Sequence, residues 1–532
     1  MNPSHAFGHR LRVAVGIASV VLTALLAGCA GALPQVTRTP SLARIAAAEA
    51  PLVAAADALK IAPGESGVWP LMQGSFALDA RLAMIENARD SIDLQYYLIA
   101  NDSTGRPILR ALRDAAERGV RVRLLVDDLY TSDLNNLFAG LAATANVEVR
   151  LFNPVVTDRA SASRRLLAMA LDFKRLNHRM HNKLFIADGA LAVVGGRNLA
   201  DEYFLRGTEN NFIDFDVLLA GRVVPELSRW FDLYWNSTAV FPWQDIERAA
   251  ASDTLPADLA RAAFDDATRN DARPQPPMAP DFFGAPSLSA ALAQRNLQFI
   301  SAEVLAFADS PNKIDPANNS IAVDDTLAHR YLLQLSDARS DVVMLSPYFI
   351  PGPETLSRIS RLRADGVAVH IVTNSLAVSD EPLANVGLQR HQRELLDMGV
   401  DLFELSSNRL KLDRTLKGLL GSSTGRLHAK VAFLDRRRVL VGSMNLDPRS
   451  STINTEIGVR IDSARLAEQV LAAFKVDSMT GVYQVKLGQN GGIRWVAVDG
   501  DSPEEVDVDP DTSFWQRLRL LLLSYFVPES QL

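Results

Sequence analysis

The sequence predicts an α/β protein made of two copies of one unit, each a mainly parallel sheet flanked by helices, with the functional site at their pseudo-twofold interface. First, a His-x-Lys-x4-Asp pattern at His181 returns at His428, and an Asn follows each His after 17 residues. Second, a strand–helix–strand pattern precedes each copy. The glycines that end the two helices, Gly119 and Gly366, are 247 residues apart, as the two histidines are. Strand–helix–strand units favour parallel strands. The equal offsets between the two copies indicate an internal duplication.

Residues 1–29 have the pattern of a bacterial export signal. A basic start with Arg10 and Arg12 is followed by an apolar stretch of 14 residues that ends at Leu26, a length typical of a signal core and short for a membrane-spanning helix. Leu26-Ala-Gly-Cys29 is similar to the lipobox of bacterial lipoproteins, which implies a lipid on Cys29 and an exported protein at the cell membrane or outer membrane, facing the periplasm. Cys29 is the only cysteine, which excludes intrachain disulfides. An uncleaved membrane anchor with a chance cysteine is the alternative.

Residues 30–60 are expected to form a polar tether and an Ala-rich N-terminal helix from Leu42 to Leu59. Residues 61–250 form the first predicted domain. Apolar runs bounded by turn residues predict strands, and an amphipathic run that ends at a glycine predicts a helix. The elements expected in this domain are a strand from Ser91 to Leu98, a helix from Arg106 to Arg118 and a strand from Val120 to Val126.

The second predicted domain spans residues 301–495 and repeats this order. Between the two domains, residues 251–300 are rich in Pro, Asp and Ala, which predicts a linker or a surface insertion. Residues 496–532 form a C-terminal tail. The elements expected in the second domain are strands at Asp341–Ile350 and Val367–Thr373 and a helix at Glu354–Ala364.

Each His-x-Lys copy predicts a β-hairpin. Two apolar runs flank a polar break at Asp188-Gly189 in the first copy and at Asp435-Arg436-Arg437 in the second, and the midpoint between the His and the Asn falls on each break. Two antiparallel strands with a tight turn fit this pattern and place each Asn beside its own His. A His and a Lys two residues apart share one face of a strand. Each hairpin therefore brings an imidazole, an ammonium and a carboxamide to one spot, which can hold a phosphate.

The aspartate of each copy is expected to lie away from the His and the Lys. Asp188 is seven residues from His181, about 23 Å along a strand and on the opposite face, so we interpret it and Asp435 as builders of the turn. A single His-x-Lys pair usually lies on an exposed edge strand, or its histidine has only structural hydrogen-bond partners. Two copies with matching spacings favour a functional site.

The two blocks resemble the paired HKD motifs of the phospholipase D superfamily. The resemblance extends over most of the chain, and its details are most similar to bacterial cardiolipin synthases of the C type. The stretches that carry it include Ile92–Tyr97, Val122–Asp128, Val194–Asn198 and Asn445–Ser450. It implies the catalytic set His181, Lys183, Asp188, His428, Lys430 and Asp435, and the phosphate-binding set Lys183, Asn198, Lys430 and Asn445.

The resemblance also implies a chemistry in two steps. One His attacks phosphorus and forms a phospho-His intermediate, while the other protonates the leaving alcohol and then deprotonates the incoming hydroxyl. It assigns His181 as the nucleophile and His428 as the general acid/base, a choice that the residues alone leave open. No metal or other cofactor is required, because the lysines and asparagines neutralise the phosphate oxygens.

Each imidazole needs an acceptor on its second nitrogen to fix its tautomer. By resemblance, Glu456 matches the orienting acid for His428. In the first half Asp216 lies at the corresponding place before an apolar strand, and Asp214 is the alternative. Solvation at the surface is the other explanation for these acids.

Three segments mix basic and apolar residues, as segments at an anionic lipid surface do. Two of them, Arg164–Arg175 and Arg409–Leu420, precede the two histidines, and the third, Phe514–Val527, is a predicted amphipathic helix in the tail. The third is too short to span a membrane and has an aromatic residue near each end. Packing against the body of the protein is the alternative for these segments.

From these features we expect a membrane-associated phosphatidyltransferase that makes cardiolipin by transferring a phosphatidyl group from phosphatidylglycerol or phosphatidylethanolamine to phosphatidylglycerol. The alternatives are a phospholipase D that hydrolyses phospholipids to phosphatidic acid, a secreted phosphodiesterase or nuclease of the same superfamily, and a lipoprotein with a vestigial site. The net charge of −7 argues against a general nucleic-acid binder, so the expected partners are phospholipids and a membrane surface. Because the two halves complete one site together, a monomer is sufficient.

Overall fold

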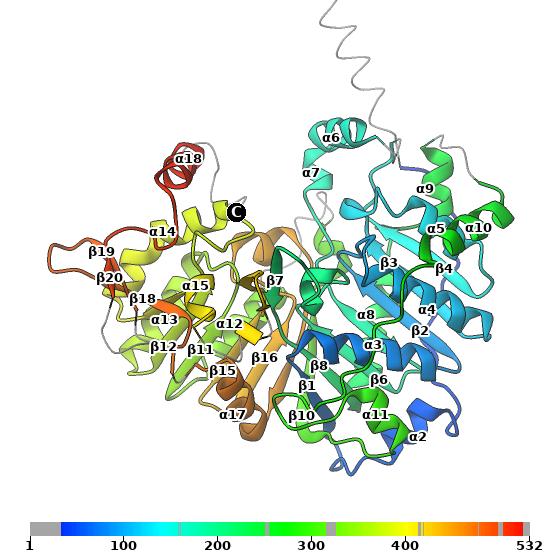
Figure 1. Ribbon diagram of the computed structural model, residues 1–532, viewed down its shortest axis with the longest axis horizontal. Helices are drawn as coiled ribbons and strands as arrows, with labels where there is room; N and C mark the ends of the chain where they lie inside the picture. Colours follow the sequence, from blue (N-terminus) through cyan, green and yellow to red (C-terminus); the bar gives the residue numbers. More distant parts are fainter. Residues whose placement is uncertain are drawn as a thin grey trace, which may run out of the picture.

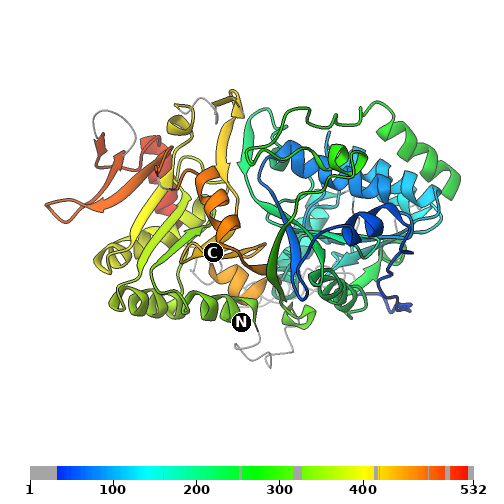
Figure 2. The same ribbon diagram turned by 90° about the horizontal axis from the view of Figure 1, so that it is seen from below.

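The computed structural model describes residues 33–157, 159, 161–250, 255–314, 326–412, 417–418, 420–476, 478–497 and 504–524. The predicted export signal, including Cys29, lies outside the described residues. The chain forms two α/β halves side by side (Figure 1), and a view turned by 90° shows the same division (Figure 2). One sheet of 18 strands runs through both halves.

The first half and the segment that follows it contain strands β1 to β9 and helices α2 to α11. The strands are β1 (Ser66–Leu71), β2 (Ser91–Tyr96), β3 (Arg121–Asp127), β4 (Val147–Phe152), β5 (Leu184–Ala187), β6 (Leu191–Gly195), β7 (Asn210–Ile213), β8 (Asp216–Gly221) and β9 (Val240–Pro242). The helices are α2 (Pro51–Asp57), α3 (Gly74–Asn87), α4 (Gly105–Glu117), α5 (Asn135–Ala142), α6 (Ala162–Leu171), α7 (Phe173–Leu176), α8 (Val223–Trp235), α9 (Trp243–Ala249), α10 (Ala257–Thr268) and α11 (Leu288–Ala293).

The second half repeats this arrangement. Its strands are β10 (Ile300–Ala308), β11 (Asp341–Leu345), β12 (Ala368–Asn374), β13 (Asp401–Leu405), β14 (Thr424–Leu427), β15 (Val431–Leu434), β16 (Arg438–Gly442), β17 (Ile457–Asp462), β18 (Val482–Leu487), β19 (Ile493–Ala497) and β20 (Glu505–Val506). Its helices are α12 (Leu327–Leu335), α13 (Pro353–Ala364), α14 (Pro382–Asp397), α15 (Ser407–Leu410), α17 (Ala464–Ala473) and α18 (Phe514–Ser524).

The order of strands confirms the predicted duplication. The first half of the sheet runs β1-β8-β6-β5-β2-β3-β4, with β9 at the outer edge. The second half runs β10-β17-β16-β15-β11-β12-β13, followed by β18, β19 and β20. The two orders correspond strand by strand, and the equivalent strands β1 and β10 pair with each other to join the halves.

Each half is a mixed sheet and not the mainly parallel one that we expected. Within the large sheet, parallel neighbours occur in β2–β3–β4 and in β11–β12–β13, and the other pairs are antiparallel. Helical crossovers link the parallel strands. The hairpins that carry the His-x-Lys pattern and the short connections after them produce antiparallel neighbours instead.

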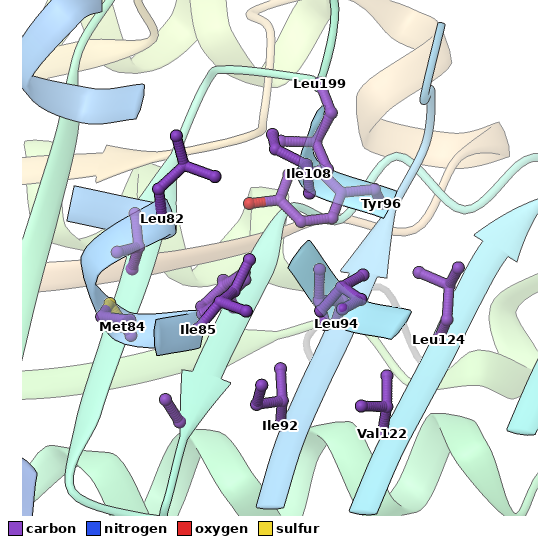
Figure 3. Packing of buried hydrophobic residues seen from close by; sticks show 14 of the residues in the cluster. Leu82, Met84, Ile85, Ile92, Leu94, Tyr96, Ile108, Val122, Leu124 and Leu199 are labelled. Atoms are coloured by element: carbon purple, nitrogen blue, oxygen red, sulfur yellow. The ribbon is translucent and has the colours of Figure 1, made fainter. Parts of the chain in front are cut away.

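Helices α3 and α4 cover one face of the sheet in the first half (Figure 3). Alternate residues of β2 and β3 point to this face and join side chains of both helices in one buried cluster. On the opposite face Asp93 and Arg123 form a buried ion pair of 2.7 Å. The side chains labelled in Figure 3 are Leu82, Met84, Ile85, Ile92, Leu94, Tyr96, Ile108, Val122, Leu124 and Leu199.

The predicted strand–helix–strand elements are present in both halves, as β2-α4-β3 and β11-α13-β12. Gly119 and Gly366 follow α4 and α13 with φ of +98° and +82°, the left-handed conformation in which many helices end. The helix expected from Leu42 is wrong in its first part, because α2 begins only at Pro51, whose fixed φ suits the first helical position. The residues before α2 lie against the first half. The amide of Ser41, for example, donates to the side chain of Asn236 at 3.0 Å.

The segment expected to be a linker or a surface insertion packs against the first half. Helix α10 lies on α5, where Phe264 is buried, and α11 lies on α3. The amide of Ser289 donates to Asp79 of α3 at 3.0 Å. No helix within the described ranges is both long enough and apolar enough to cross a membrane.

Candidate active site

Both predicted hairpins are present. Strands β5 and β6 pair antiparallel, and so do β15 and β16. The turns between them have positive φ at both central positions, +54° and +63° in Asp188-Gly189 and +52° at both residues of Asp435-Arg436. The sheet register places Ala187 opposite Leu191 and Leu434 opposite Arg438, so three residues connect the two strands of each hairpin.

The two aspartates hold these turns to the rest of the sheet. Asp188 accepts hydrogen bonds of 2.8 to 3.1 Å from the backbone amides of residues 89–91, where β2 begins. Asp435 accepts equivalent bonds of 2.6 to 3.2 Å from residues 339–341, where β11 begins. Each lies at the opposite end of its strand from the His-x-Lys pair. The catalytic role that the resemblance implies for them is therefore not supported, and their place is that of turn builders.

Each histidine lies beside a segment of the other half. The amide of His181 donates to the carbonyl of Thr455 at 2.9 Å, in a parallel bridge centred on Met180. The amide of His428 donates to the carbonyl of Ile213 at 2.8 Å, at the end of the parallel pair β7–β14. The residue that follows each carbonyl is an acid, so each histidine meets an acid of the other half.

The structure pairs the acids across the two halves. Nδ1 of His181 lies 3.0 Å from a carboxylate oxygen of Glu456, and Nδ1 of His428 lies 2.6 Å from one of Asp214. We expected Glu456 beside His428 and Asp216 in the first half. Both expectations are corrected, because the parallel pairs between the halves exchange the partners.

Asp216 belongs to a buried ion cluster instead. It accepts from Arg81 of α3 at 2.9 Å and lies 3.3 Å from Arg197. Arg197 also donates to the carbonyls of Leu71 and Tyr203, at 2.8 and 3.0 Å. This cluster shapes the backbone between β6 and β8.

A signal in the sequence identifies the correct acid. The sheet register places Gly195 opposite Asp216, and Gly442 opposite Gly458, so Asp214 is the equivalent of Glu456. Both acids begin a pattern of acid, apolar residue, any residue and valine: Asp-Phe-Asp-Val in the first half and Glu-Ile-Gly-Val in the second. The connection before this pattern is longer in the first half, which hides the match from simple counting.

The two acids have different surroundings. Glu456 also accepts hydrogen bonds from the hydroxyls of Ser443 and of Ser450, the latter at 2.8 Å. Burial alone would raise the pKa of Glu456, but the charge and hydrogen bond of His181 lower it. Gly196 stands where Ser443 stands in the second half, and a Cβ there would collide with the carboxylate of Asp214.

Both lysines lie buried beside their own histidines. Nζ of Lys183 donates to the carbonyl of His181, and Nζ of Lys430 to that of His428, both at 2.6 Å. Nζ of Lys430 also lies 3.0 Å from Nε2 of His428. Burial lowers the pKa of Lys183 well below its usual range and that of Lys430 to about 8, as expected for cations without a bound anion.

The two asparagines follow the hairpins, and both are buried. The side-chain amide of Asn198 donates to the hydroxyl of Tyr203 at 2.9 Å and accepts from the amide of Leu98 at 3.3 Å. The side-chain oxygen of Asn445 has no hydrogen-bond partner among the described residues. A buried acceptor without a partner is costly, and this oxygen is therefore available to a hydrogen-bond donor of a ligand.

Aromatic rings that the sequence analysis did not identify surround the imidazoles. The ring centroid of Tyr97 lies 5.0 Å from that of His181. Those of Tyr203 and Phe212 lie 5.0 and 4.9 Å from that of His428. Burial lowers the pKa of His181 to about 4, although Glu456 acts in the opposite direction, and burial and Lys430 lower the pKa of His428. At neutral pH both imidazoles are neutral before substrate binds.

In the part of the chain that the structure describes, no group of three or more His, Cys, Asp or Glu side chains is arranged to hold a metal ion. The groups that converge on the site are the two imidazoles, two ammonium groups, two carboxamides and two carboxylates. Such a set suits an anion held between the halves, with a nucleophile and a proton carrier on either side of it.

Comparison with known proteins identifies the family. The family model described as "Cardiolipin synthase, PLD-like domain" matches residues 82–235 and 331–478. Cardiolipin synthase C of Escherichia coli (strain K12) is 35% identical over 470 residues, which cover 87% of this chain and 95% of that protein. Cardiolipin synthase 1 of Staphylococcus aureus (strain MRSA252) is 26% identical over 406 residues, which cover 76% of this chain and 66% of that protein.

A solved structure shares the fold. The crystal structure of phosphatidylserine synthase from Haemophilus influenzae Rd KW20 superposes with a TM-score of 0.52, covering 88% of this chain and 95% of that one at 13% identity. The fold, the duplicated site and the sequence matches agree. The chain therefore belongs to the cardiolipin synthase family of phospholipase D-like domains and is an enzyme of that family.

Proposed function

We propose that this enzyme makes cardiolipin by transferring a phosphatidyl group from phosphatidylglycerol or phosphatidylethanolamine to phosphatidylglycerol through a phospho-histidine intermediate. The observation that carries the proposal is the crossed arrangement of His181 and His428, in which the other half supplies the acid on each Nδ1. The acid fixes the Nδ1–H tautomer and leaves Nε2 of each ring for chemistry.

His181 is the nucleophile in this proposal. Its Nδ1–H donates to Glu456, so Nε2 carries a lone pair, and the described part of the chain places no hydrogen-bond partner on Nε2. The low pKa of His181, about 4 because of burial, keeps this nitrogen unprotonated at neutral pH. Nδ1 and Nε2 of His428 both lie 3.0 Å from Nζ of Lys430, so this ammonium group faces the ring of His428.

The first step breaks the bond between phosphorus and the headgroup oxygen. Nε2 of His181 attacks phosphorus, and His428 transfers its proton to the leaving alcohol. His428 takes up this proton when the phosphodiester anion binds, because the added negative charge raises the pKa of the imidazole. The two lysines and the amide group of Asn445 stabilise the charge on the non-bridging oxygens.

The second step forms the product. His428, now neutral, removes the proton from a hydroxyl of phosphatidylglycerol, and the oxygen attacks phosphorus while the bond to Nε2 of His181 breaks. When cardiolipin leaves, His428 releases this proton, and it takes up another when the next phosphodiester anion binds. Water in the acceptor's place gives phosphatidic acid, so the balance between transfer and hydrolysis depends on which acceptor reaches His428.

Product analysis tests the proposal. Purified enzyme is incubated with phosphatidylglycerol, with and without phosphatidylethanolamine, and the lipids are identified by mass spectrometry. Cardiolipin is the expected main product, and headgroup-labelled donors identify the donor from the free alcohol that is released. Phosphatidic acid as the sole product would establish a hydrolase, and cleavage of DNA without any lipid product would reject a lipid substrate.

The proposal includes attachment to a membrane through a lipid on Cys29, which lies outside the described residues. The support is the Leu26-Ala-Gly-Cys29 sequence after an apolar stretch. A Cys29→Ser variant should keep its N-terminal signal and lose the mass of the lipid in intact-protein mass spectrometry. An unchanged mass would reject lipidation and leave the transfer chemistry untouched.

A further inference from the structure

Helices α6 and α7 carry apolar side chains that the body of the protein does not cover. Leu166 is 70% exposed, Leu171 41% and Phe173 54%. The opposite side of α6 is buried through Arg165 and Ala168. The pair is thus fixed to the body on one side and presents apolar groups to solvent on the other, and Figure 1 shows both helices standing out from the first half.

Helix α18 has the same character in the second half. Figure 1 shows it standing out from the same side of the molecule as α6 and α7. Its side chain at Leu520 is buried, which anchors the helix. The exposed apolar residues of α18 are Phe514 at 62%, Trp515 at 73%, Leu521 at 56% and Leu522 at 58%.

Helices α6 and α7 lie next to the first histidine. They follow β4, at the carboxyl end of the parallel strands, and α7 ends at Leu176, five residues before His181. Asn153, the residue after β4, donates to the carbonyls of Arg175 and His178 at 3.0 and 2.7 Å. These bonds fix the end of α7 to the strand edge where His181 lies.

Helix α18 lies next to the second histidine. Leu520 packs with Leu376, which is two residues after the end of β12. Asn374, the last residue of β12, bonds both backbone groups of Leu427 at 2.8 and 2.9 Å, and Leu427 precedes His428. The exposed apolar helices of both halves therefore flank the edge of the sheet that carries both histidines.

The charges on these helices oppose the charge of the chain. The net charge of the protein is −7. None of the three helices contains an acid within its bounds. Arg165 is buried and Arg175 pairs with Asp172 at 2.6 Å, so the exposed cations are Arg164, Lys174 and Arg519. An apolar surface with cations among its exposed rings and leucines is complementary to anionic headgroups above acyl chains. A second copy of this acidic chain is a poorer match.

We propose that α6, α7 and α18 form one membrane-docking face, which seats on an anionic lipid bilayer and brings the edge of the sheet that carries both histidines to its surface. This rests on the proposed function, because a substrate drawn from a bilayer is what requires such a face. The N-terminal lipid would only tether the chain, whereas this face would set its orientation.

Quenching of Trp515 tests the second-half part of the face. Trp515 is 73% exposed, whereas Trp230 is partly buried and Trp69, Trp235, Trp243 and Trp495 are buried. In phosphatidylglycerol vesicles with brominated acyl chains, the fluorescence of the full-length protein should be quenched. A Trp515→Phe variant should lose most of that quenching, while its turnover of a water-soluble short-chain phospholipid stays unchanged.

A new tryptophan tests the first-half part. Leu166→Trp on α6 should add a quenched emission in the Trp515→Phe background. Leu259→Trp is the matched control, because Leu259 is 53% exposed on α10, a helix that carries acids and lies at the outer edge of the first half, away from the second half (Figure 1). The control tryptophan should remain unquenched in the same vesicles.

Charge reversal tests the complementarity. Lys174 and Arg519 are exposed, and each cation near an anionic surface contributes about fivefold to partitioning. A Lys174→Glu and Arg519→Glu double variant should lose at least about twentyfold in partitioning onto phosphatidylglycerol vesicles when each change removes one such contribution. Its partitioning onto neutral phosphatidylcholine vesicles should stay the same.

The outcomes separate the two proposals. If neither Trp515 nor the tryptophan introduced by Leu166→Trp is quenched in an enzyme that turns over vesicle lipid at full rate, the docking face is overturned and the proposed function stays intact. Quenching without any transfer to a phospholipid would overturn the proposed function and leave the face intact. A dimer in solution that Trp515→Glu converts to monomer would show that a second chain covers the face, which also overturns the proposal.

Discussion

The two half-sites have the same backbone and different acids. In each, a hairpin places a His-x-Lys pair beside a parallel segment of the other half, and Nδ1 of the histidine meets a carboxylate. Glu456, beside His181, is held by two serine hydroxyls, whereas Asp214, beside His428, has Gly196 where the second half has Ser443. Duplication explains the shared geometry. The difference shows that the two copies have diverged, as expected if each histidine has its own step.

The largest expected effect comes from removing either histidine. His181→Ala and His428→Ala should each lower phosphatidyl transfer by about 10³-fold or more. A donor with a p-nitrophenol leaving group separates their roles, because such a group leaves without a proton. With this donor His428→Ala should still release p-nitrophenol and accumulate an adduct on His181, while His181→Ala should do neither.

Release of p-nitrophenol by His181→Ala but not by His428→Ala would reverse the two roles. Tandem mass spectrometry of the trapped adduct identifies the modified histidine directly. The thermal midpoint of each variant, compared with that of the wild type, controls for loss of folding.

The acids should give the next largest effect. Glu456→Gln and Asp214→Asn remove the charge that stabilises an imidazolium and the acceptor that fixes the tautomer, and each should cost about 10²- to 10⁴-fold in turnover of a natural phospholipid. Because Asp214 serves His428, the loss in Asp214→Asn should shrink with the p-nitrophenol donor, and that in Glu456→Gln should persist. Equal losses with both donors would contradict the crossed pairing of roles.

The pH dependence of kcat/KM should report the deprotonation of Lys430, the lysine of the second half. Lys430 has a pKa of about 8 because of burial, so its cationic form is present below that pH and is lost as the pH rises through it. The kcat/KM for a phospholipid should therefore fall above pH 8, by about tenfold per pH unit when one proton is lost. In Lys430→Arg this limb should move to higher pH, because arginine stays charged. A limb unchanged in Lys430→Arg would assign it to another group.

The smallest effect on catalysis is expected at the turn aspartates. Asp188→Ala removes a fully buried carboxylate that accepts from the backbone amides of residues 89–91, at a cost of about 3 kcal/mol in the free energy of unfolding. Asp435, whose partners lie at the surface, should cost less. Urea denaturation measures both, and the turnover per folded molecule should stay near that of the wild type. A loss of turnover without a loss of stability would return these residues to the catalytic set.

Local patterns were enough to predict most of the fold. The strand–helix–strand elements follow from apolar runs that end at Gly119 and Gly366, and the hairpins follow from the breaks at Asp188 and Asp435. The helix expected from Leu42 was wrong in its first part, because a run of alanines favours a helix only where no proline and no long-range contact directs the backbone otherwise. The mixed sheet was also missed. The direction of neighbouring strands depends on which strands pair and on how loops or helices connect them, and the secondary-structure propensities of single residues do not encode this.

The sequence by itself determined that two His-x-Lys hairpins exist and that they are copies, because spacing along a chain is a local property that duplication preserves. Only the tertiary structure decided which acid meets which histidine, which asparagine is left available and which aromatic rings enclose the imidazoles. Those facts depend on how the two halves pair at residues 180 and 455 and along β7 and β14. Contacts between segments more than 200 residues apart come from the packing of two folded surfaces, and no local pattern encodes them.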